Sequence, residues 1–362
     1  MKKLVIFSAT ASPHQVRFVP YLAEYFDVQH YFYDRVAKVR QSFWRVELGE
    51  RCHLLPYTFK WRAKYITLSG LWVLHKERPD ILMLGSFSIP SNYLAYLWAR
   101  WHHVPVVVFT ERSRDKKGRL RGKGLVWRIL RFLYRNVTRV MVTAEDIVPQ
   151  FRDVFNFGSK VIAGRYPTDI GQYFSHKVRT RKDSYNIIFP NRMIDIYNPI
   201  GAVEIFAEVH ERYPKTRLKM NASGDLRSAV EQRIVELGIS DCVEFLDNIR
   251  SWDDLSGIYA SCDIMILPAK FSNGNYTISE CAASGMGCVI SDRILGDPTE
   301  DLRKAGVGFI LPLDKKLFVE KVCWYIEHPE VFAKEAEANR RQLQYLTHEA
   351  TAKLYFDLFG NL

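Results

Sequence analysis

The feature that most constrains the fold of this chain is a repeated alternation of short apolar runs with longer amphipathic stretches. Five runs lie in the first part of the chain, at 4–7, 81–85, 104–109, 139–143 and 161–163. Six more follow, at 187–190, 218–220, 243–246, 264–267, 288–291 and 309–311. Short buried strands that alternate with helix-length segments are typical of parallel βαβ units. The sequence therefore predicts an α/β protein built from two such units in series.

The stretch between the two groups of runs has the character of a linker. It contains Pro167, Gly171 and the charged run 176–183, and it lacks sustained periodicity. We therefore expect a first domain over 1–170, a linker over 171–185 and a second domain over 186–340. The residues 341–362 are predicted to form a C-terminal helix that crosses back to the first domain. Within the second domain, Asn198 followed by Pro199 predicts a helix start, and Gly285 predicts a helix end.

Charge is divided unequally between the two predicted domains. Residues 1–175 hold 28 Lys and Arg against 13 Asp and Glu, a balance of +15, while the remainder holds 23 against 27, a balance of −4. The two sum to the net charge of +11. The basic character therefore belongs to the first domain and points to an anionic partner of that domain.

Apolar runs and cysteines constrain the cellular context. Every long apolar run is interrupted before the 18 residues that a membrane-spanning helix needs. The apolar run at 4–7 is also too short for a signal peptide and is better explained as a buried strand. The six cysteines form no C-x-x-C pair, which favours a reducing compartment and no structural zinc. We expect a cytoplasmic protein that associates peripherally with the inner face of the cytoplasmic membrane.

A basic amphipathic segment in the first domain supports that expectation. Residues 114–135 carry nine basic residues and one acidic residue among aromatic and aliphatic side chains. Such a pattern is typical of helices that bind a membrane interface. The predicted membrane-binding residues are Arg121, Lys123, Trp127, Arg128, Arg131 and Arg135. The alternative is that the apolar stripe packs on the sheet and the basic face is merely solvated. Nucleic acid is not expected as a partner, because no recognition motif accompanies the charge.

The most informative stretch for chemistry is 268–280, which follows a predicted strand of the second domain. Ligands of open parallel sheets bind beyond the carboxyl ends of the strands. Asn273, Gly274 and Asn275 permit close backbone approach, and Thr277 begins a helix whose first amides suit a diphosphate. Glu280 falls in the first turn of that helix, where a carboxylate can accept hydrogen bonds from sugar hydroxyls; ordinary helix charge preference is the alternative.

The run 280–291, Glu-Cys-Ala-Ala-Ser-Gly-Met-Gly-Cys-Val-Ile-Ser, resembles the E-A-M-A-C-G-x-P-V-I segment of glycosyltransferase family 4. The resemblance extends over most of the second domain, and in the first domain it covers mainly 78–81 and 104–108. It implies the GT-B fold, in which two Rossmann-like domains face each other across a cleft. It also implies sugar transfer from a nucleotide donor, with UDP or GDP as the expected nucleotide and no cofactor.

The resemblance also implies roles for individual residues. Glu280 corresponds to the second Glu of the family's E-x7-E motif, which binds the ribose, and Ser272 stands in place of the first. Arg192 corresponds to the arginine that neutralises the diphosphate. The lysine usually found five residues later is Tyr197, so Lys270 or Arg293 is a candidate for the missing charge. The expected donor-binding residues are Arg192, Asn248, Lys270, Ser272, Asn275, Tyr276, Thr277 and Glu280.

Two residues of the first domain complete the predicted site. Glu111 stands where the family places a histidine near the sugar, and it either holds a donor hydroxyl and stabilises developing positive charge or forms an ion pair with Arg112 or Arg114. His14 is a candidate on the acceptor side. The predicted catalytic residues are thus Glu111, Arg192 and Glu280. Residues with metal-ligand spacing are missing from the sequence, and metal-independent transfer with retention of anomeric configuration is expected.

These features predict a glycosyltransferase that acts on a lipid-linked or anionic glycan acceptor in bacterial surface polysaccharide or glycolipid assembly. One alternative is a nucleotide-sugar epimerase on the same fold, which has no need of a membrane-facing basic domain. Another is a non-catalytic, membrane-associated scaffold with a degenerate transferase fold. Binding to vesicles and stabilisation by nucleotides would separate these hypotheses.

Overall fold

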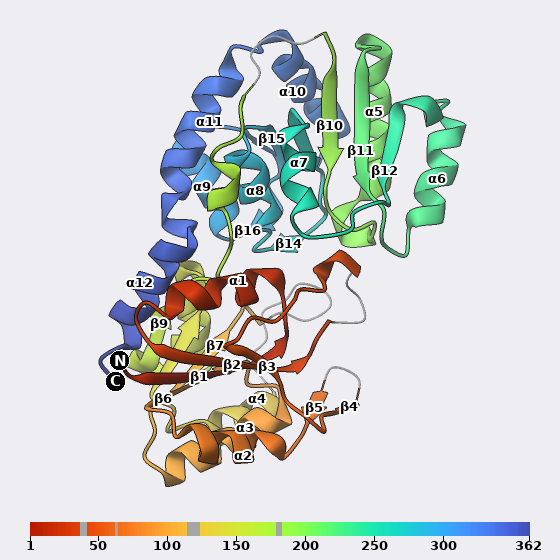
Figure 1. Cartoon of the computed structure of the whole chain (residues 1–362). Helices are drawn as coiled ribbons and strands as arrows, with labels where there is room; N and C mark the ends of the chain where they lie inside the picture. Colours follow the sequence, from red (N-terminus) through yellow and green to blue (C-terminus); the bar gives the residue numbers. More distant parts are fainter. Residues whose placement is uncertain (37–41, 62–63, 114–123, 179–182) are drawn as a thin grey trace. The chain divides into compact units, whose positions relative to one another are not determined.

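The computed structural model describes residues 1–36, 42–61, 64–113, 124–178 and 183–362. The chain divides into two compact units (Figure 1). The first comprises Met1–Asp169 and Leu346–Leu362, and the second comprises Ile170–Tyr345. Within the described residues, none of the helices combines the length and apolarity that crossing a membrane requires.

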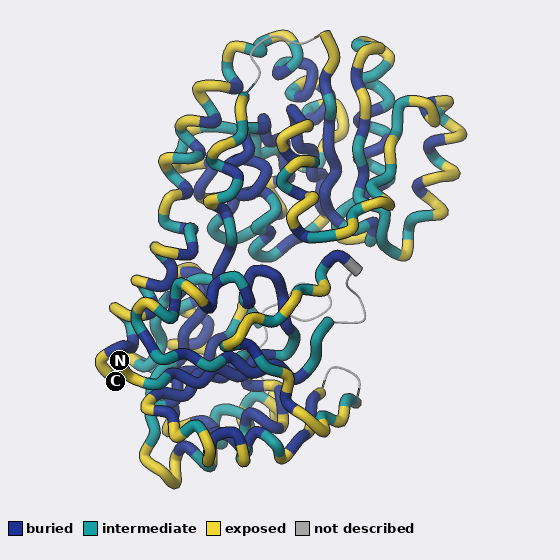
Figure 2. The backbone as a smooth tube through the Cα atoms, viewed as in Figure 1, coloured by how far each residue is buried: buried dark blue, intermediate teal, exposed yellow. Residues whose placement is uncertain are grey.

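The first unit is built on a seven-stranded parallel sheet in the order β3-β2-β1-β6-β7-β8-β9. Its strands are β1 (Lys3–Thr10), β2 (Asp27–Asp34), β3 (Cys52–Leu54), β6 (Ile81–Gly85), β7 (Val106–Thr110), β8 (Arg139–Val142) and β9 (Val161–Ala163). A separate antiparallel hairpin joins β4 (Phe59–Trp61) to β5 (Lys64–Ile66). The central strands are buried along their length, as the dark tube in Figure 2 shows.

Helices cover both faces of this sheet. On one face lie α2 (Ser69–Glu77), α3 (Pro90–Trp101) and α4 (Leu125–Leu133), whose inward side chains share a core with the sheet. On the other face lie α1 (Pro13–Leu22) and the C-terminal helix α12 (His348–Phe359). Tyr355 of α12 packs edge-on against Phe18 of α1, with ring centroids 5.3 Å apart. The last helix of the chain is therefore part of the first unit.

The second unit contains a six-stranded parallel sheet in the order β12-β11-β10-β13-β15-β17. Its strands are β10 (Tyr185–Phe189), β11 (Thr216–Asn221), β12 (Val243–Leu246), β13 (Ile264–Leu267), β15 (Gly287–Ser291) and β17 (Phe309–Leu311), and a small ladder pairs β14 (Ser272–Asn273) with β16 (Ile294–Leu295). Its helices are α5 (Pro199–Arg212), α6 (Arg227–Glu236), α7 (Asp254–Ala260), α8 (Thr277–Ala283), α9 (Asp297–Ala305), α10 (Lys315–Glu327) and α11 (Val331–Gln342).

Two helix ends of this unit form as their sequences predict. Asn198 caps α5, and its side chain accepts a hydrogen bond from the backbone N–H of Gly201 at 3.3 Å. Gly285 follows α8 in a left-handed conformation, with φ of +92°. This conformation is accessible to glycine because it lacks a Cβ atom.

The segment expected to act as a linker, 171–185, is in part packed into the second unit. Tyr173 is fully buried, and its ring centroid lies 5.6 Å from that of Tyr259 in α7. His176 Nε2 lies 2.8 Å from Ser256 Oγ, and Arg340 donates to the His176 carbonyl at 2.6 Å. Although its sequence is polar and aperiodic, this stretch is not simply a linker, because Tyr173 and His176 hold it against α7.

Candidate active site

The loops after β10, β11, β12 and β13 meet at the carboxyl edge of the second sheet, because all four strands are parallel neighbours. Arg192 lies half-buried in the loop after β10. The backbone N–H of Met193 donates to the Ser223 carbonyl at 2.6 Å, and Leu226 N–H donates to the Met193 carbonyl at 2.9 Å. These bonds fix the Arg192 loop against the loop that follows β11.

Gly224 makes this close approach possible. Its φ is +139°, and a Cβ atom added there would lie 2.3 Å from the Met193 carbonyl oxygen. A contact that short with backbone atoms cannot be relieved by a side-chain rotation. The position of Arg192 therefore depends on the absence of a side chain at residue 224.

Lys270 lies in the loop after β13, beside the same segment. Its backbone N–H donates to the Ile196 carbonyl at 2.8 Å, next to Tyr197. Its ammonium group forms an exposed ion pair with Asp195. Lys270 thus contacts Asp195 and Ile196, the two residues that precede Tyr197 in the chain. Arg293, the other candidate for this charge, is exposed beyond β15.

The segment 272–280 forms the most buried part of this edge. Ser272 is buried in β14, where it is paired with Ile294 of β16. Asn275 is also buried, and Glu280 in the first turn of α8 is only 4% exposed. Tyr276 and Thr277 between them are half-buried. Asn248, beyond β12, is exposed.

Two amide groups at this edge lack hydrogen-bond partners among the described residues, namely Asn191 Oδ1 and Asn275 Nδ2. Leaving a buried amide group without a hydrogen bond costs about 1–3 kcal/mol. Asn191 directly precedes Arg192 after β10, and Asn275 follows β14 in the segment that leads into α8. This edge therefore carries two cations, of which Lys270 is paired with Asp195, one buried carboxylate and two amide groups without a partner among the described residues.

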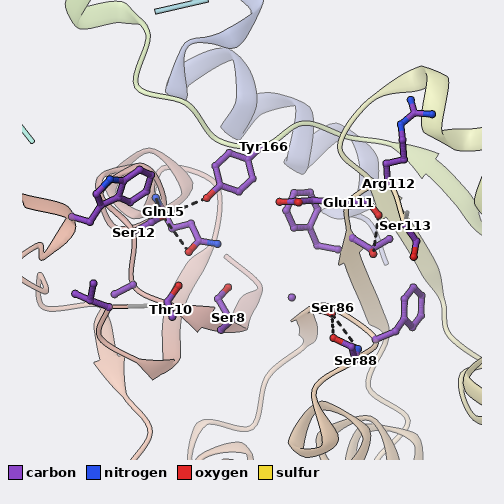
Figure 3. A pocket seen from close by; sticks show the side chains of 18 of the residues that line it. Ser8, Thr10, Ser12, Gln15, Ser86, Ser88, Glu111, Arg112, Ser113 and Tyr166 are labelled. Atoms are coloured by element: carbon purple, nitrogen blue, oxygen red, sulfur yellow. Dashed lines mark hydrogen bonds between the residues drawn. The ribbon is translucent and has the colours of Figure 1, made fainter. Parts of the chain in front are cut away.

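The first unit carries a pocket of about 480 Å³ at the carboxyl ends of β1, β6 and β7 (Figure 3). Hydroxyl-bearing side chains dominate its polar lining: Ser8, Thr10, Ser12, Ser86, Ser88, Thr110, Ser113 and Tyr166. Aromatic walls are provided by Trp44, Phe109 and Trp127. Hydroxyl groups beside aromatic rings suit a ligand with both polar edges and apolar faces, as in a sugar ring.

Among the described residues, the charged side chains that line this pocket are Glu111 and Arg112. Glu111 is exposed, and Arg112 is half-buried with its guanidinium group paired to Asp146. Figure 3 shows the Arg112 guanidinium directed away from the hollow. Arg112 therefore forms an ion pair with Asp146, whereas the sequence suggested Glu111 as its partner. Arg114 lies outside the described residues.

His14 is not among the residues that line the pocket. It is buried in α1, where its ring packs edge-on against Trp44 and Tyr166 at centroid distances of 6.1 and 6.0 Å. His14 therefore packs against two residues that do line the pocket, and its place on the acceptor side stays a prediction.

A different histidine contacts a pocket residue. His30 Nε2 of β2 lies 2.8 Å from Ser8 Oγ of β1, and its ring stacks on Phe32 with centroids 4.1 Å apart. Burial lowers the pKa of His30 to about 3, because the charged imidazolium cannot be solvated there. His30 is consequently neutral near pH 7 and holds the Ser8 hydroxyl in place.

The predicted membrane-binding residues separate into two groups on α4. Arg128 in α4 and Arg135 in the turn after it are exposed and Arg131 is half-buried, while Trp127 packs against Phe155 with centroids 4.6 Å apart. Trp127 is thus half-buried against the core and lines the hydroxyl-lined pocket, away from the exposed arginines. Arg121 and Lys123 lie outside the described residues.

Comparison with known families identifies the group to which the chain belongs. The profile of the "Glycosyl transferase 4-like domain" matches residues 10–162, and the profile of "Glycosyl transferases group 1" matches residues 184–328. Each profile falls within one of the two compact units. The chain belongs to the family 4-like glycosyltransferases. Its two parallel α/β units are those of the GT-B fold.

Solved structures with the same fold match this glycosyltransferase along its length. Anabaena Alr3699/HepE, solved in complex with UDP, is 12% identical and has a TM-score of 0.74, with 100% of each chain covered. WaaG, described as a glycosyltransferase involved in lipopolysaccharide biosynthesis, is 13% identical and has a TM-score of 0.67, with 99% of this chain and 100% of that chain covered.

A curated relative matches over a shorter span. The Vi polysaccharide biosynthesis protein VipC/TviE of Salmonella typhi is 24% identical over 161 residues, which is 44% of this chain. The matched span covers 27% of the length of that relative.

The sequence of this glycosyltransferase did not lead us to predict the hydroxyl-bearing residues that line the pocket of the first unit. Ser8 and Thr10 end β1, and Ser86 follows β6. The rule that ligands bind beyond the carboxyl ends of parallel strands could have found these positions. Tyr166 could not have been found in this way, because it lies beyond β9 and reaches the pocket through the tertiary fold.

Proposed function

We propose that this glycosyltransferase moves a sugar from a nucleotide-sugar donor to a lipid-linked or anionic glycan acceptor in the assembly of bacterial surface polysaccharide or glycolipid. The observation that carries the proposal is the convergence of Arg192, Lys270 and Glu280 at one edge of the second sheet. Two cations with a buried carboxylate match a ligand that has a diphosphate and a ribose.

In this proposal Arg192 neutralises the donor diphosphate, because a guanidinium group binds phosphate oxygens in a bidentate manner. Lys270 supplies the positive charge that Tyr197 lacks, since the backbone N–H of Lys270 donates to the carbonyl of Ile196, the residue before Tyr197. Glu280 accepts hydrogen bonds from the ribose hydroxyls, and Asn248 contacts the base. The complex of HepE with UDP-glucose, a protein of the same fold, supports a nucleotide-sugar ligand.

The donor sugar is assigned to the remaining residues of the buried segment, which are Ser272, Asn275, Tyr276 and Thr277. Asn275 Nδ2 is the group best suited to a sugar hydroxyl, because it is buried and lacks a partner among the described residues. A hydrogen bond to such a group adds affinity without displacing an internal partner.

The proposed chemistry is metal-independent and retaining. The acceptor hydroxyl oxygen bonds to the anomeric carbon on the side from which the diphosphate departs, so the new glycosidic bond keeps the configuration of the old one. The bond from the anomeric carbon to the diphosphate oxygen breaks, and the proton of the acceptor hydroxyl passes to an oxygen of the departing diphosphate. Positive side chains then stabilise the leaving diphosphate electrostatically. Glu111, at the rim of the first-unit pocket, contributes a carboxylate that holds a sugar hydroxyl and stabilises positive charge at the reacting carbon.

The acceptor is assigned to the hydroxyl-lined pocket of the first unit. Its eight described hydroxyl-bearing residues and its aromatic walls suit a glycan. The names of the relatives point to polysaccharide assembly in VipC/TviE and to lipopolysaccharide biosynthesis in WaaG.

We also propose that the first unit binds the inner face of the cytoplasmic membrane through α4. Leu125, Ile129 and Phe132 are 71%, 47% and 61% exposed on this short helix, next to Arg128 and Arg131. Exposed apolar side chains beside cations suit an anionic interface, where each Lys or Arg adds about 1 kcal/mol. The alternative, an apolar stripe wholly packed on the sheet, does not account for these three exposed side chains.

The experiment that tests the donor assignment is thermal unfolding against UDP-, GDP-, ADP- and CMP-sugars. A ligand at a hundred times its Kd adds about 2.7 kcal/mol to the stability of the native state. We expect a selective shift with one nucleotide and its loss in Arg192→Ala, whose unliganded unfolding temperature should be unchanged. Absence of a shift with every donor, or an unaltered shift in Arg192→Ala, would overturn the assignment.

A further inference from the structure

A second cavity of about 480 Å³ lies on the outer flank of α4, separate from the hydroxyl-lined pocket. Four of its seven lining residues are cations: Arg128, Arg131, Arg135 and Lys160. The other three are Phe132, Asn156 and Phe157, so none of the described lining residues is a carboxylate. A cavity whose charged groups are all cations is destabilised by their mutual repulsion unless an anion occupies it.

The spacing along the chain helps to explain why the arginines line one cavity. Arg128 and Arg131 lie three residues apart, on one side of α4, and Arg135 lies in the turn that follows the end of this helix at Leu133. Lys160 joins them from the turn before β9, where its ammonium group donates to the Arg135 carbonyl at 2.6 Å. This bond holds the lysine at the cavity through a neutral partner and leaves its charge uncompensated.

The guanidinium group of Arg135 is also held without a counter-ion. It lies over the Phe132 ring, 4.5 Å from the centroid. Within the described part of the chain, the recorded ion pairs include none of these four cations. By contrast, Arg152 in the neighbouring turn is paired with Asp153. Among the described residues, these four positive charges therefore have no ion-pair partner, and the contacts of Lys160 and Arg135 hold two of them at the cavity.

We infer that this cavity binds the phosphate group of a lipid headgroup and prefers a phosphomonoester to a phosphodiester. A phosphomonoester carries a charge of about −1.5 to −2 at neutral pH and three acceptor oxygens, which several guanidinium groups can share. Asn156 adds an amide donor, and Phe157 forms an apolar wall.

The lipid origin of the phosphate follows from the surroundings of the cavity. Phe132 lines the cavity and is itself 61% exposed, and Leu125 and Ile129 are exposed on the same helix. A soluble phosphate has no need of such apolar neighbours, whereas a headgroup brings acyl chains beside it. This inference rests on the proposed membrane association and adds a defined headgroup site to it.

The test compares vesicles of equal surface charge that contain either phosphatidic acid, a phosphomonoester, or phosphatidylglycerol, a phosphodiester. We expect the protein to bind phosphatidic acid vesicles more tightly. Arg131→Gln should weaken that binding by roughly tenfold, the equivalent of one charge-assisted hydrogen bond, and should remove the preference. Arg152→Gln makes the same charge change outside the cavity and is the matched control.

The possible outcomes separate this inference from the proposed function. Equal binding of both vesicles, unaffected by Arg131→Gln, would overturn the headgroup site and leave membrane association standing. If the protein bound neither kind of vesicle, both the headgroup site and the proposed membrane association would be overturned. The donor-binding assay would still report on the transferase site. Binding of inorganic phosphate or an oligonucleotide in an Arg131-dependent manner, without vesicle binding, would overturn the lipid assignment. Lys160→Gln should weaken phosphatidic acid binding as Arg131→Gln does, with the unfolding temperature of each variant confirming that it is folded.

Discussion

Stability of the first unit should fall steeply below neutral pH because of His30. Burial lowers the pKa of this side chain to about 3, whereas an unfolded histidine titrates at 6.5. Between these values the unfolded state binds a proton that the folded state excludes, so the stabilising effect of the neutral imidazole is complete above pH 6.5 and is lost as pH falls. At 1.36 kcal/mol per pH unit, lowering the pH from 7 to 5 should remove about 2 kcal/mol.

Replacing His30→Gln removes the titrating group and keeps an amide that can reach Ser8 Oγ, which lies 2.8 Å from His30 Nε2. The free energy of unfolding is measured by urea denaturation at pH 7 and at pH 5. We expect the loss between these two pH values to be about 2 kcal/mol smaller in this variant than in the unaltered protein. Ser8→Ala is the control, because it removes the hydrogen bond but keeps the buried imidazole and its pH dependence. An equal loss of stability in the unaltered protein and His30→Gln would refute the reasoning.

Three further predictions concern the loops of the second unit. Gly224→Ala places a Cβ atom against the Met193 carbonyl and should lower the free energy of unfolding by about 1–3 kcal/mol, as measured in urea; a variant as stable as the unaltered protein would show that the two loops can separate. Lys270→Gln breaks an exposed ion pair with Asp195, so it should change stability by less than about 1 kcal/mol but reduce the thermal shift that the preferred nucleotide-sugar produces. An undiminished shift would remove Lys270 from the donor site. Asn198→Ala should cost about 1 kcal/mol for the lost helix cap, and Asn198→Gly less, because residue 198 has φ of +55°; the reverse order in denaturation experiments would contradict the capping argument.

The strands with continuous apolar sequence were predictable from the chain alone. The structure places strands at 161–163, 243–246, 264–267 and 309–311, with the bounds that the sequence indicated. The run 264–267 is buried along its length, whereas the other three are edge strands that are only partly buried. All four are short, mostly apolar runs bounded by helix-length segments, which is sufficient to identify them. The same reasoning applies to the helix that starts at Pro199, because its cap and first residue are local signals.

The strand β2, Asp27–Asp34, was missed because its sequence alternates polar and aromatic residues without a clean apolar run. His30 and Gln29 argue against burial when they are read in isolation. In the folded protein His30 is buried because Ser8 of the neighbouring strand provides a hydrogen-bond partner and Phe32 covers its ring. The burial of β2 thus depends on a contact between Ser8 and His30, which are 22 residues apart in the chain.

The sequence by itself determined the class of the protein: two parallel α/β units, a donor-binding segment around Glu280 and a basic first unit. Those properties depend on local composition and on the order of residues along the chain. Only the tertiary structure decided which side of α4 is exposed, because apolar residues occur on both sides of that helix. It also brought Lys160 to Arg135, 25 residues apart in the chain, and gathered hydroxyl groups from three strand ends into one pocket. Sites of this kind arise from sheet order and helix packing, which a single sequence does not encode in any local pattern.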